Sequence, residues 1–301
     1  MRVHYTDHHQ VELPEGHRFP MGKYRQLREL LGEHGILAEN ELHPAELAPL
    51  AAVRAVHSAR YVDGILNGDL PAPEIKRLGF PWSRALVQRS LASVGGTLAA
   101  SRWALEEGLS GSLAGGTHHA YRDFGSGFCV FNDLVIAATT LLEQQLVERV
   151  LVFDVDVHQG DGTAALCEGE PRVFTCSLHG AKNFPARKQT SDLDVPLPDG
   201  TSDELYLGEM ERALDLCLAS GAFDLVLVQG GVDGLATDRL GRLALTEAGV
   251  AERDRRLLGR LRSEGLPVAL TLGGGYGEPI ETSLAAHLGT YRAAKELENR
   301  R

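Results

Sequence analysis

Cysteine and long apolar runs are scarce in this chain of 301 residues. Its four cysteines are too few to cross-link a chain of this size, and no two of them form a C-x-x-C pair. This usage favours a reducing environment, and we expect a cytoplasmic protein. The chain contains no stretch of roughly 18 uncharged apolar residues, and it begins with the mixed segment Met1–Asp7. The sequence therefore predicts no membrane partner and no export signal.

Positive charge is also in short supply. The chain has 30 Lys and Arg residues against 41 Asp and Glu residues, and no basic block is longer than two residues. Proteins that bind nucleic acid need clustered cations to displace counterions from phosphates, so we expect no nucleic-acid partner.

Four common site motifs are also missing from the sequence: G-x-S-x-G, H-E-x-x-H, G-x-G-x-x-G and the P-loop. Their absence argues against nucleotide-dependent chemistry and against two common hydrolase types.

Short apolar runs alternate with longer helical patterns from about residue 100 onward. The runs are Val150–Phe153, Val173–Cys176, Leu225–Val228 and Val268–Thr271. Strands that are buried on both faces have this composition, so we predict an α/β fold with a central, mostly parallel sheet between two layers of helices. The expected helices are Arg84–Glu107, Asp133–Gln145, Ser202–Ala219, Thr246–Glu264 and Pro279–Leu297. Candidate cap residues are Asn132, Ser202, Gly108, Gly221 and Gly265.

The remaining segments are less regular. Residues 1–80 are richer in His and Pro, and we expect them to supply one outer strand, helices and loops at the rim of a site. The stretch from Gly180 to Thr201 carries charges and three prolines, which is typical of a long irregular loop. No repeat or linker divides the sequence. We therefore predict a single domain over residues 1–301.

Side chains that carry chemistry gather where the predicted strands end. Directly after the run Val150–Phe153, the polar residues Asp154, Asp156 and His158 alternate with valines. Side chains in an extended segment repeat every two residues, so these three point to the same side. Aspartates and glycines after a strand also make turns. Two buried carboxylates and an imidazole on one side would, however, be unfavourable without a cation, so we predict a metal site.

A third ligand comes from another strand end. Asp233 follows the run Leu225–Val228, and on its own it would be an ordinary turn residue. With Asp156 and His158 it gives three protein ligands and leaves a fourth position open, which is the arrangement of catalytic zinc. Two carboxylates and one imidazole also suit iron(II) and manganese(II).

Two further glycine-rich segments follow strands or apolar runs. The first, Gly115-Gly116-Thr117, precedes the adjacent histidines His118 and His119, which can present two imidazoles to one cavity. The second, Gly273 to Gly277, contains Tyr276, whose phenol can reach a substrate oxygen. Alone, such segments are more often a surface histidine pair and a flexible turn. Their placement beside the predicted metal site favours the catalytic interpretation.

Taken together, five segments resemble the zinc-dependent histone deacetylase family in sequence and in order. They are G-G-T-H-H-A (115–120), G-F-C-V-F-N-D (127–133), D-V-D-V-H-Q-G-D-G (154–162), G-V-D (231–233) and G-G-G-Y (273–276). The segments H-R-F-P-M (17–21), L-G-F-P-W (78–82) and N-F-P (183–185) are most similar to the class IV-like branch of bacteria and plants. The resemblance implies the arginase/deacetylase fold, with a sheet of about eight parallel strands.

The resemblance also implies roles for individual residues. The zinc ligands would be Asp156, His158 and Asp233. The catalytic residues would be His118, His119, Tyr276, Asp154 and Asp161. Asp154 would orient the imidazole of His118, Asp161 would orient that of His119, and the phenol of Tyr276 would stabilise the oxyanion. The substrate would contact Gly127, Phe128, Phe184 and Gly274. A structural potassium ion would be held, partly through backbone oxygens, by Asp154, Asp156, His158, Ser177 and Leu178.

The activity implied is metal-dependent hydrolysis that removes an acetyl or longer acyl group from an N-acyl amine, above all an Nε-acyl-lysine. An acetylpolyamine or another small amide is the alternative substrate. An arginase-like ureohydrolase would need ligands for a second metal, which the segments after His158 and Asp233 lack. A non-catalytic acyl-lysine-binding module should have lost a ligand, a histidine or the tyrosine, and this chain keeps them all.

The chain departs from the family pattern in the rim loop 77–83, which has no aspartate to hold a peptide backbone. The acyl length, the native metal and the oligomeric state stay open.

Overall fold

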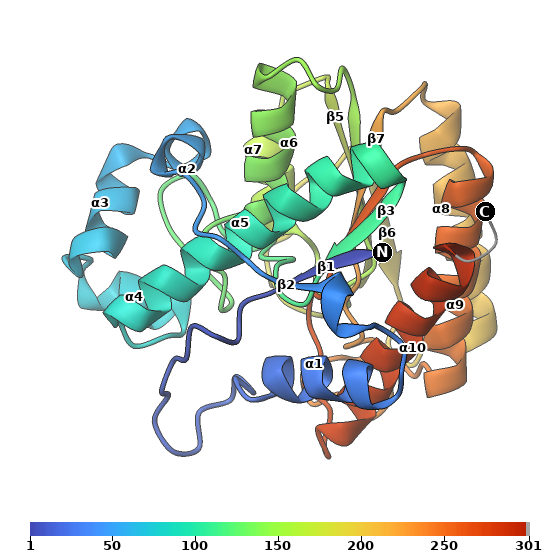
Figure 1. The fold of residues 1–301 in the computed structure, drawn as a ribbon, viewed down its shortest axis with the longest axis horizontal. Coiled ribbons are helices and arrows are strands. Elements are labelled where there is room, and N and C mark those ends of the chain that lie inside the picture. Colours follow the sequence, from blue (N-terminus) through green and yellow to red (C-terminus); the bar gives the residue numbers. More distant parts are fainter. Residues whose placement is uncertain (299–301) are drawn as a thin grey trace.

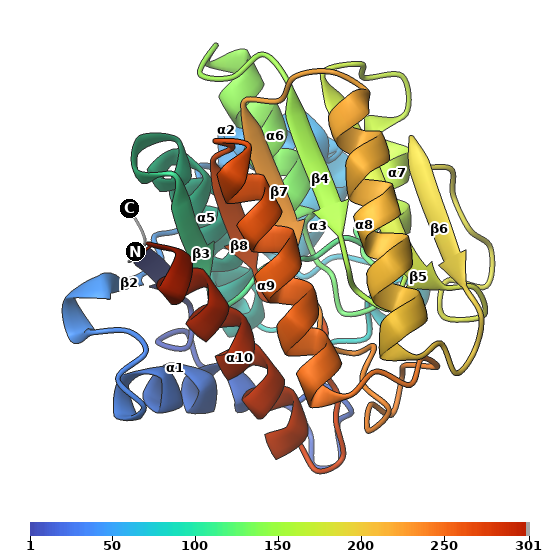
Figure 2. The ribbon, with the colours of Figure 1, turned by 90° about the vertical axis from the view of Figure 1, so that its right-hand side faces the viewer.

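The computed structural model describes residues 1–298 and contains one sheet of eight strands, all parallel. The strand order is β2-β1-β3-β8-β7-β4-β5-β6 (Figures 1 and 2). The strands are β1 (Arg2–Tyr5), β2 (Leu42–Pro44), β3 (Leu109–Ser112), β4 (Val150–Asp154), β5 (Val173–Gly180), β6 (Leu193–Leu197), β7 (Leu225–Gln229) and β8 (Val268–Thr271). The central strands β4 and β7 are buried along their whole length, as expected for a sheet covered on both faces.

Helices cover the two faces of the sheet. In Figure 2, α8, α9 and α10 lie side by side across the face toward the viewer, and α5 and α6 lie behind the sheet. The short helices α2, α3 and α4 extend from the α5 side, away from α8 to α10 (Figure 1). The helices are α1 (Lys23–Glu33), α2 (Leu50–Val56), α3 (Ala59–Asn67), α4 (Ala72–Leu78), α5 (Arg84–Glu107), α6 (Asp133–Glu143), α7 (Asp161–Cys167), α8 (Asp203–Ala219), α9 (Glu247–Ser263) and α10 (Glu281–Glu298). The predicted three-layer α/β/α architecture is therefore confirmed.

The elements predicted from residue 84 onward are found close to their expected positions. Helix α5 spans the predicted residues and ends at Gly108, which adopts a left-handed conformation with φ of 82°. Asn132 caps α6, because its side chain accepts the backbone N–H of Val135. Ser202 occupies the N-cap position of α8 without a side-chain capping bond. Helices α8 and α9 end shortly before the predicted glycines, with one further residue at each C-cap.

Two predictions about strands were incomplete or wrong, and one strand was not predicted. The stretch from Gly180 to Thr201 is not wholly irregular, since it contains the end of β5 and the edge strand β6, where Pro196 is tolerated. Residues 1–80 supply two strands rather than one. Strand β3 has the small, polar sequence Leu-Ser-Gly-Ser and gives no apolar signal, yet it is buried. Its Gly111 leaves room for the ring of Tyr291, which lies 3.1 Å from the position of a Cβ atom.

No helix within residues 1–298 is both long enough and apolar enough to span a bilayer. All four cysteines are buried and free, so no disulfide contributes to the fold.

Candidate active site

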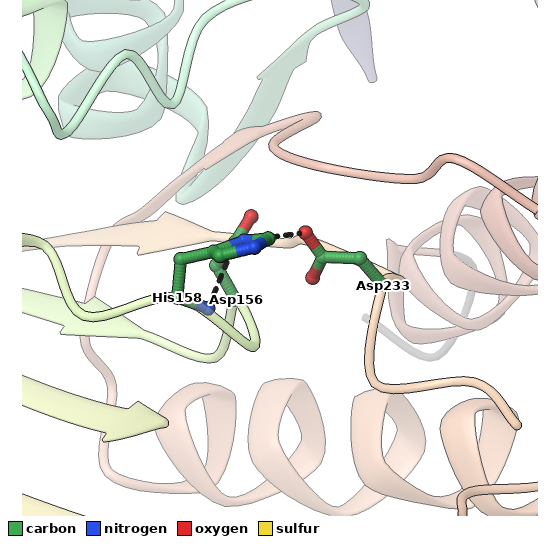
Figure 3. Close-up of side chains that lie close together, drawn as sticks. All are labelled: Asp156, His158 and Asp233. Atoms are coloured by element: carbon green, nitrogen blue, oxygen red, sulfur yellow. Dashed lines mark hydrogen bonds and ion pairs between the residues drawn. The ribbon is translucent and has the colours of Figure 1, made fainter. Parts of the chain in front are cut away.

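The three predicted metal ligands converge at the carboxyl edge of the sheet. Asp156 and His158 follow β4 and Asp233 follows β7, and these two strands pair directly. All three side chains are buried. The Nδ1 atom of His158 lies 2.9 Å from an oxygen of Asp156 and 3.1 Å from an oxygen of Asp233 (Figure 3). One donor atom from each residue lies within 4.8 Å of the others.

The chemistry of this cluster fits a divalent cation. One imidazole faces two carboxylates inside the protein, and burial together with the charge of Asp156 raises the pKa of Asp233 to about 7. A cation between the three donor atoms would remove that repulsion. The second oxygen of Asp156 accepts hydrogen bonds of 2.8 Å from the Gln229 side chain and from the Gly274 N–H, which fix the direction of the carboxylate. Gln229 was not identified in the sequence, because a glutamine that ends a strand carries no metal signal.

The two adjacent histidines lie next to the metal cluster, and each is paired with a carboxylate. Nδ1 of His118 is 2.6 Å from Asp154, and Nδ1 of His119 is 2.5 Å from Asp161. Burial lowers the pKa of His119 to about 4, with a contribution from neighbouring His118. Burial also acts to lower the pKa of His118, but Asp154 and Asp156 outweigh it and raise the value to about 9. The two shifts have opposite directions, so the surroundings favour a neutral imidazole at His119 and a protonated one at His118.

A buried carboxylate for which the sequence predicted no role in the site holds the histidine loop. Asp133, the first residue of α6, accepts hydrogen bonds from the backbone N–H groups of Gly116 and Thr117 at 3.0 and 2.7 Å. Its carboxylate oxygens also accept hydrogen bonds from the hydroxyl groups of Thr97 and Thr117, each with an oxygen–oxygen distance of 2.5 Å. Gly115 has a φ of 82°, and a Cβ atom there would lie 2.3 Å from Asp133. The glycine turn and Asp133 together place the two imidazoles.

Tyr276 enters the site from the loop after β8. The residue is 8% exposed, and within residues 1–298 its hydroxyl has no hydrogen-bond partner. Burial raises the pKa of Tyr276 well above its ordinary value, so the phenol keeps its proton and can donate it in a hydrogen bond. The backbone N–H of Tyr276 donates to Asp238 at 2.6 Å, and the other oxygen of Asp238 accepts the N–H groups of Leu240 and Gly241. Asp238 thus joins two loops of the site.

A cavity of about 670 Å³ connects these groups to solvent, and all four predicted substrate-binding residues line it. Gly127 has a φ of 52°, and a Cβ atom there would lie 2.6 Å from the His119 ring. Phe128 also has a positive φ, 66°, and its N–H donates to the carbonyl of Leu78. Phe184 is 44% exposed, and its ring packs edge-on against His119 at 4.9 Å between centroids. The structure therefore brings both aromatic side chains to the cavity that leads to the histidines.

Gly274 also lines the cavity, and a Cβ atom at this position would lie 1.9 Å from Asp233, so only glycine fits beside the metal cluster. Asp154 and Ser177 are paired neighbours on β4 and β5, and Leu178 follows on β5. The predicted potassium ligands thus lie on the adjoining strands β4 and β5 and, for Asp156 and His158, in the loop after β4; potassium binding stays a prediction.

Comparison with known proteins decides the family. A model of the histone deacetylase domain matches residues 17–290, which is most of the chain. The chain belongs to the histone deacetylase family. It is 43% identical over 295 residues to an uncharacterized protein of Picosynechococcus, with 98% of both chains covered. It is 27% identical over 271 residues to histone deacetylase 2 of Arabidopsis thaliana, covering 86% of this chain and 70% of that protein.

Solved structures of histone deacetylase homologues share the fold. The homologue from Aquifex aeolicus superposes with a TM-score of 0.82 at 22% identity, covering 99% of this chain and 84% of that one. A homologue in complex with SAHA superposes with a TM-score of 0.79 at 21% identity, covering 99% of this chain and 88% of that one. As a member of the histone deacetylase family, the protein is a hydrolase that acts on linear acyl amides.

Proposed function

We propose that this histone deacetylase family member removes acyl groups from Nε-acyl-lysine. The observation that carries the proposal is the meeting of three elements in one cavity: the metal cluster, the paired imidazoles and the phenol of Tyr276, whose hydroxyl is free to donate. The homologue that binds SAHA supports the same reaction class. We propose zinc as the native metal, while iron(II) and manganese(II) suit the same donors.

The metal ligands and the two histidines would have different tasks in the reaction. A cation held by Asp156, His158 and Asp233 would polarise the acyl carbonyl and make a bound water more acidic. Nδ1 of His119 faces the Asp161 carboxylate and would donate to it, so that the other ring nitrogen would carry a lone pair and could accept a proton from the attacking water. The leaving amine then receives a proton from His119 or from protonated His118.

The walls of the cavity orient the substrate. The phenol of Tyr276 donates a hydrogen bond to the oxygen on which negative charge develops. Phe128 and Phe184 contact the apolar stem of the acyl-lysine. Phe128 is held in place by its backbone bond to Leu78 and by ring contacts of 5.4 Å with Phe19 and 5.3 Å with Phe80. The reacting amide is thus positioned between the phenol and the histidine pair.

The proposal is tested with purified protein and acetyl-lysine, myristoyl-lysine and acetylpolyamine substrates, with and without a chelator. We expect hydrolysis of at least one acyl-lysine substrate and its loss on chelation. Hydrolysis of acetylpolyamine alone would contradict the assignment of the substrate, and no hydrolysis of any of the three would contradict the proposed reaction.

Replacing Tyr276 by phenylalanine removes only the hydroxyl. Because that hydroxyl stabilises charge in the transition state, we expect kcat to fall by about 10²–10³-fold while the melting temperature and the metal content stay the same. Steady-state kinetics on an acyl-lysine peptide measure the effect. Near wild-type turnover of the variant would show that the phenol does not stabilise the oxyanion.

Asp238 is proposed to act through Tyr276. In Asp238→Asn an amide replaces one carboxylate oxygen, so the side chain can no longer accept hydrogen bonds on both sides. We expect kcat to fall by about tenfold and the free energy of unfolding by about 1–3 kcal/mol, the effect of an unsatisfied buried group. A double-mutant cycle with Tyr276→Phe separates the roles. If the effects of the two substitutions on kcat multiply, Asp238 does not act by placing the tyrosine.

A further inference from the structure

The opening of the cavity is positively charged, although the chain as a whole has a net charge of −11. Five exposed cationic side chains line it, and we refer to them as the basic rim: Arg18, Lys76, Arg77, Lys182 and Arg242. These five side chains are exposed, whereas the metal cluster is buried. We therefore place the basic rim at the opening of the cavity and the metal cluster in its interior. Among the described residues, the only carboxylates that line the cavity are Asp156 and Asp233, which belong to the metal cluster.

Most of this positive charge is not neutralised by the protein. Within residues 1–298, Arg18, Lys76 and Arg77 form no salt bridge, and the Arg77 guanidinium lies 4.5 Å from the centre of the Phe124 ring. Lys182 and Arg242 share a single carboxylate, Asp199, at 3.6 and 3.3 Å. Elsewhere on the surface, by contrast, Arg172 pairs with Glu170 at 2.6 Å and Arg212 pairs with Glu209 at 2.6 Å.

The rim is attached to the walls of the cavity. Lys76 and Arg77 lie in the last turn of α4, and the next residue, Leu78, accepts the N–H of Phe128. On the loop after β5, the side chain of Asn183 donates to the carbonyl of Leu240 at 2.7 Å, which joins the segments that carry Lys182 and Arg242. The cations therefore surround the route by which an acyl-lysine would enter.

We propose that the basic rim selects acyl-lysines that lie within acidic peptide segments. This inference rests on the proposed function, which it narrows to one class of substrate. Cations from four separate segments match several carboxylates spaced along a peptide better than one carboxylate on a small molecule. The same charges repel polyamines and lysine-rich peptides, which disfavours both as substrates.

Three otherwise identical peptides test the proposal. Each carries a central Nε-acetyl-lysine, with glutamates, serines or lysines on both sides. We expect kcat/KM to decrease in that order, with at least about a tenfold difference between the glutamate and lysine peptides at low salt. The difference should shrink at about 0.5 M salt, where charges are screened over a few ångströms.

The serine peptide separates the two proposals. If no peptide is hydrolysed, the proposed function itself fails. If the serine peptide is hydrolysed and the charged peptides match it, only the role of the basic rim is wrong. An equal gain from the single α-carboxylate of free Nε-acetyl-lysine, compared with its α-amide, would overturn the assignment to peptides.

A matched pair of variants locates the effect. The triple variant Arg18→Gln/Lys76→Gln/Arg77→Gln removes three rim charges that have no carboxylate partner within residues 1–298, and we expect the preference for the glutamate peptide over the serine peptide to fall toward one. The control variant Arg172→Gln/Arg212→Gln/Arg255→Gln removes the same charge from exposed residues that do not line the cavity. It should keep the preference. Equal losses in both variants would assign the effect to net charge and overturn the proposal.

Discussion

Asp233→Asn is expected to purify without tightly bound metal and to lose acyl-lysine hydrolysis. The substitution keeps the shape of the side chain and its acceptor for the N–H of Val157, which lies 2.9 Å away. It removes the negative charge that would face the cation beside His158 and Asp156. Loss of a group that hydrogen-bonds to a metal ligand lowers activity by roughly 10–100-fold, and we expect kcat/KM to fall by more than this when a ligand itself is lost. Elemental analysis and kinetics measure the two effects.

A stability measurement separates the loss of metal from misfolding. At a metal concentration about 100 times Kd, binding adds about 2.7 kcal/mol to the free energy of unfolding. A chelator should therefore lower the melting temperature of the wild type and leave that of Asp233→Asn unchanged. Asp215→Asn, at an exposed residue of α8, serves as the control and should respond like the wild type. A variant that retains about one metal ion per chain would show that Asp233 is not a ligand.

The metal cluster could be predicted because its geometry follows from local rules. A side-chain period of two predicts Asp156 and His158 on one side, and a buried apolar strand fixes where the segment begins. In the structure the chain bends at residues 156–158, and the Asp156 carboxylate accepts a hydrogen bond from the N–H of His158, which keeps the two side chains together. Asp233 lies far away in the sequence, but it also follows an apolar strand. In a parallel sheet such strands end at the same edge, so the third ligand could be placed as well.

Other parts of the site depend on contacts that no local pattern indicates. Asp238 and Tyr276 are 38 residues apart, and Asp133 acts on a loop 16 and 17 residues earlier. An aspartate in a turn or at a helix start has the same appearance whether or not it holds a catalytic loop. The buried strand β3 was missed for a related reason, because its small residues make room for Tyr291 from α10.

The basic rim shows the same limit at the level of charge. Its five cations are spread over four segments, and no two segments are neighbours in the sequence. Counting charges along the chain gives an acidic protein, and only the fold gathers these cations at one opening. Net charge therefore predicted the absence of a nucleic-acid partner but carried no information about the entrance to the site.

His119→Gln is expected to lower kcat by about 10²–10⁴-fold, the range for loss of a general base. The lowered pKa of about 4 leaves His119 neutral at pH 7 and able to accept a proton, whereas His118, with a pKa of about 9, is already protonated. Since glutamine cannot accept and release a proton in this way, metal content should be retained while turnover falls. His118→Gln should lower kcat less. The opposite order of the two effects would exchange the roles of the histidines, because the base would then be the imidazole paired with Asp154.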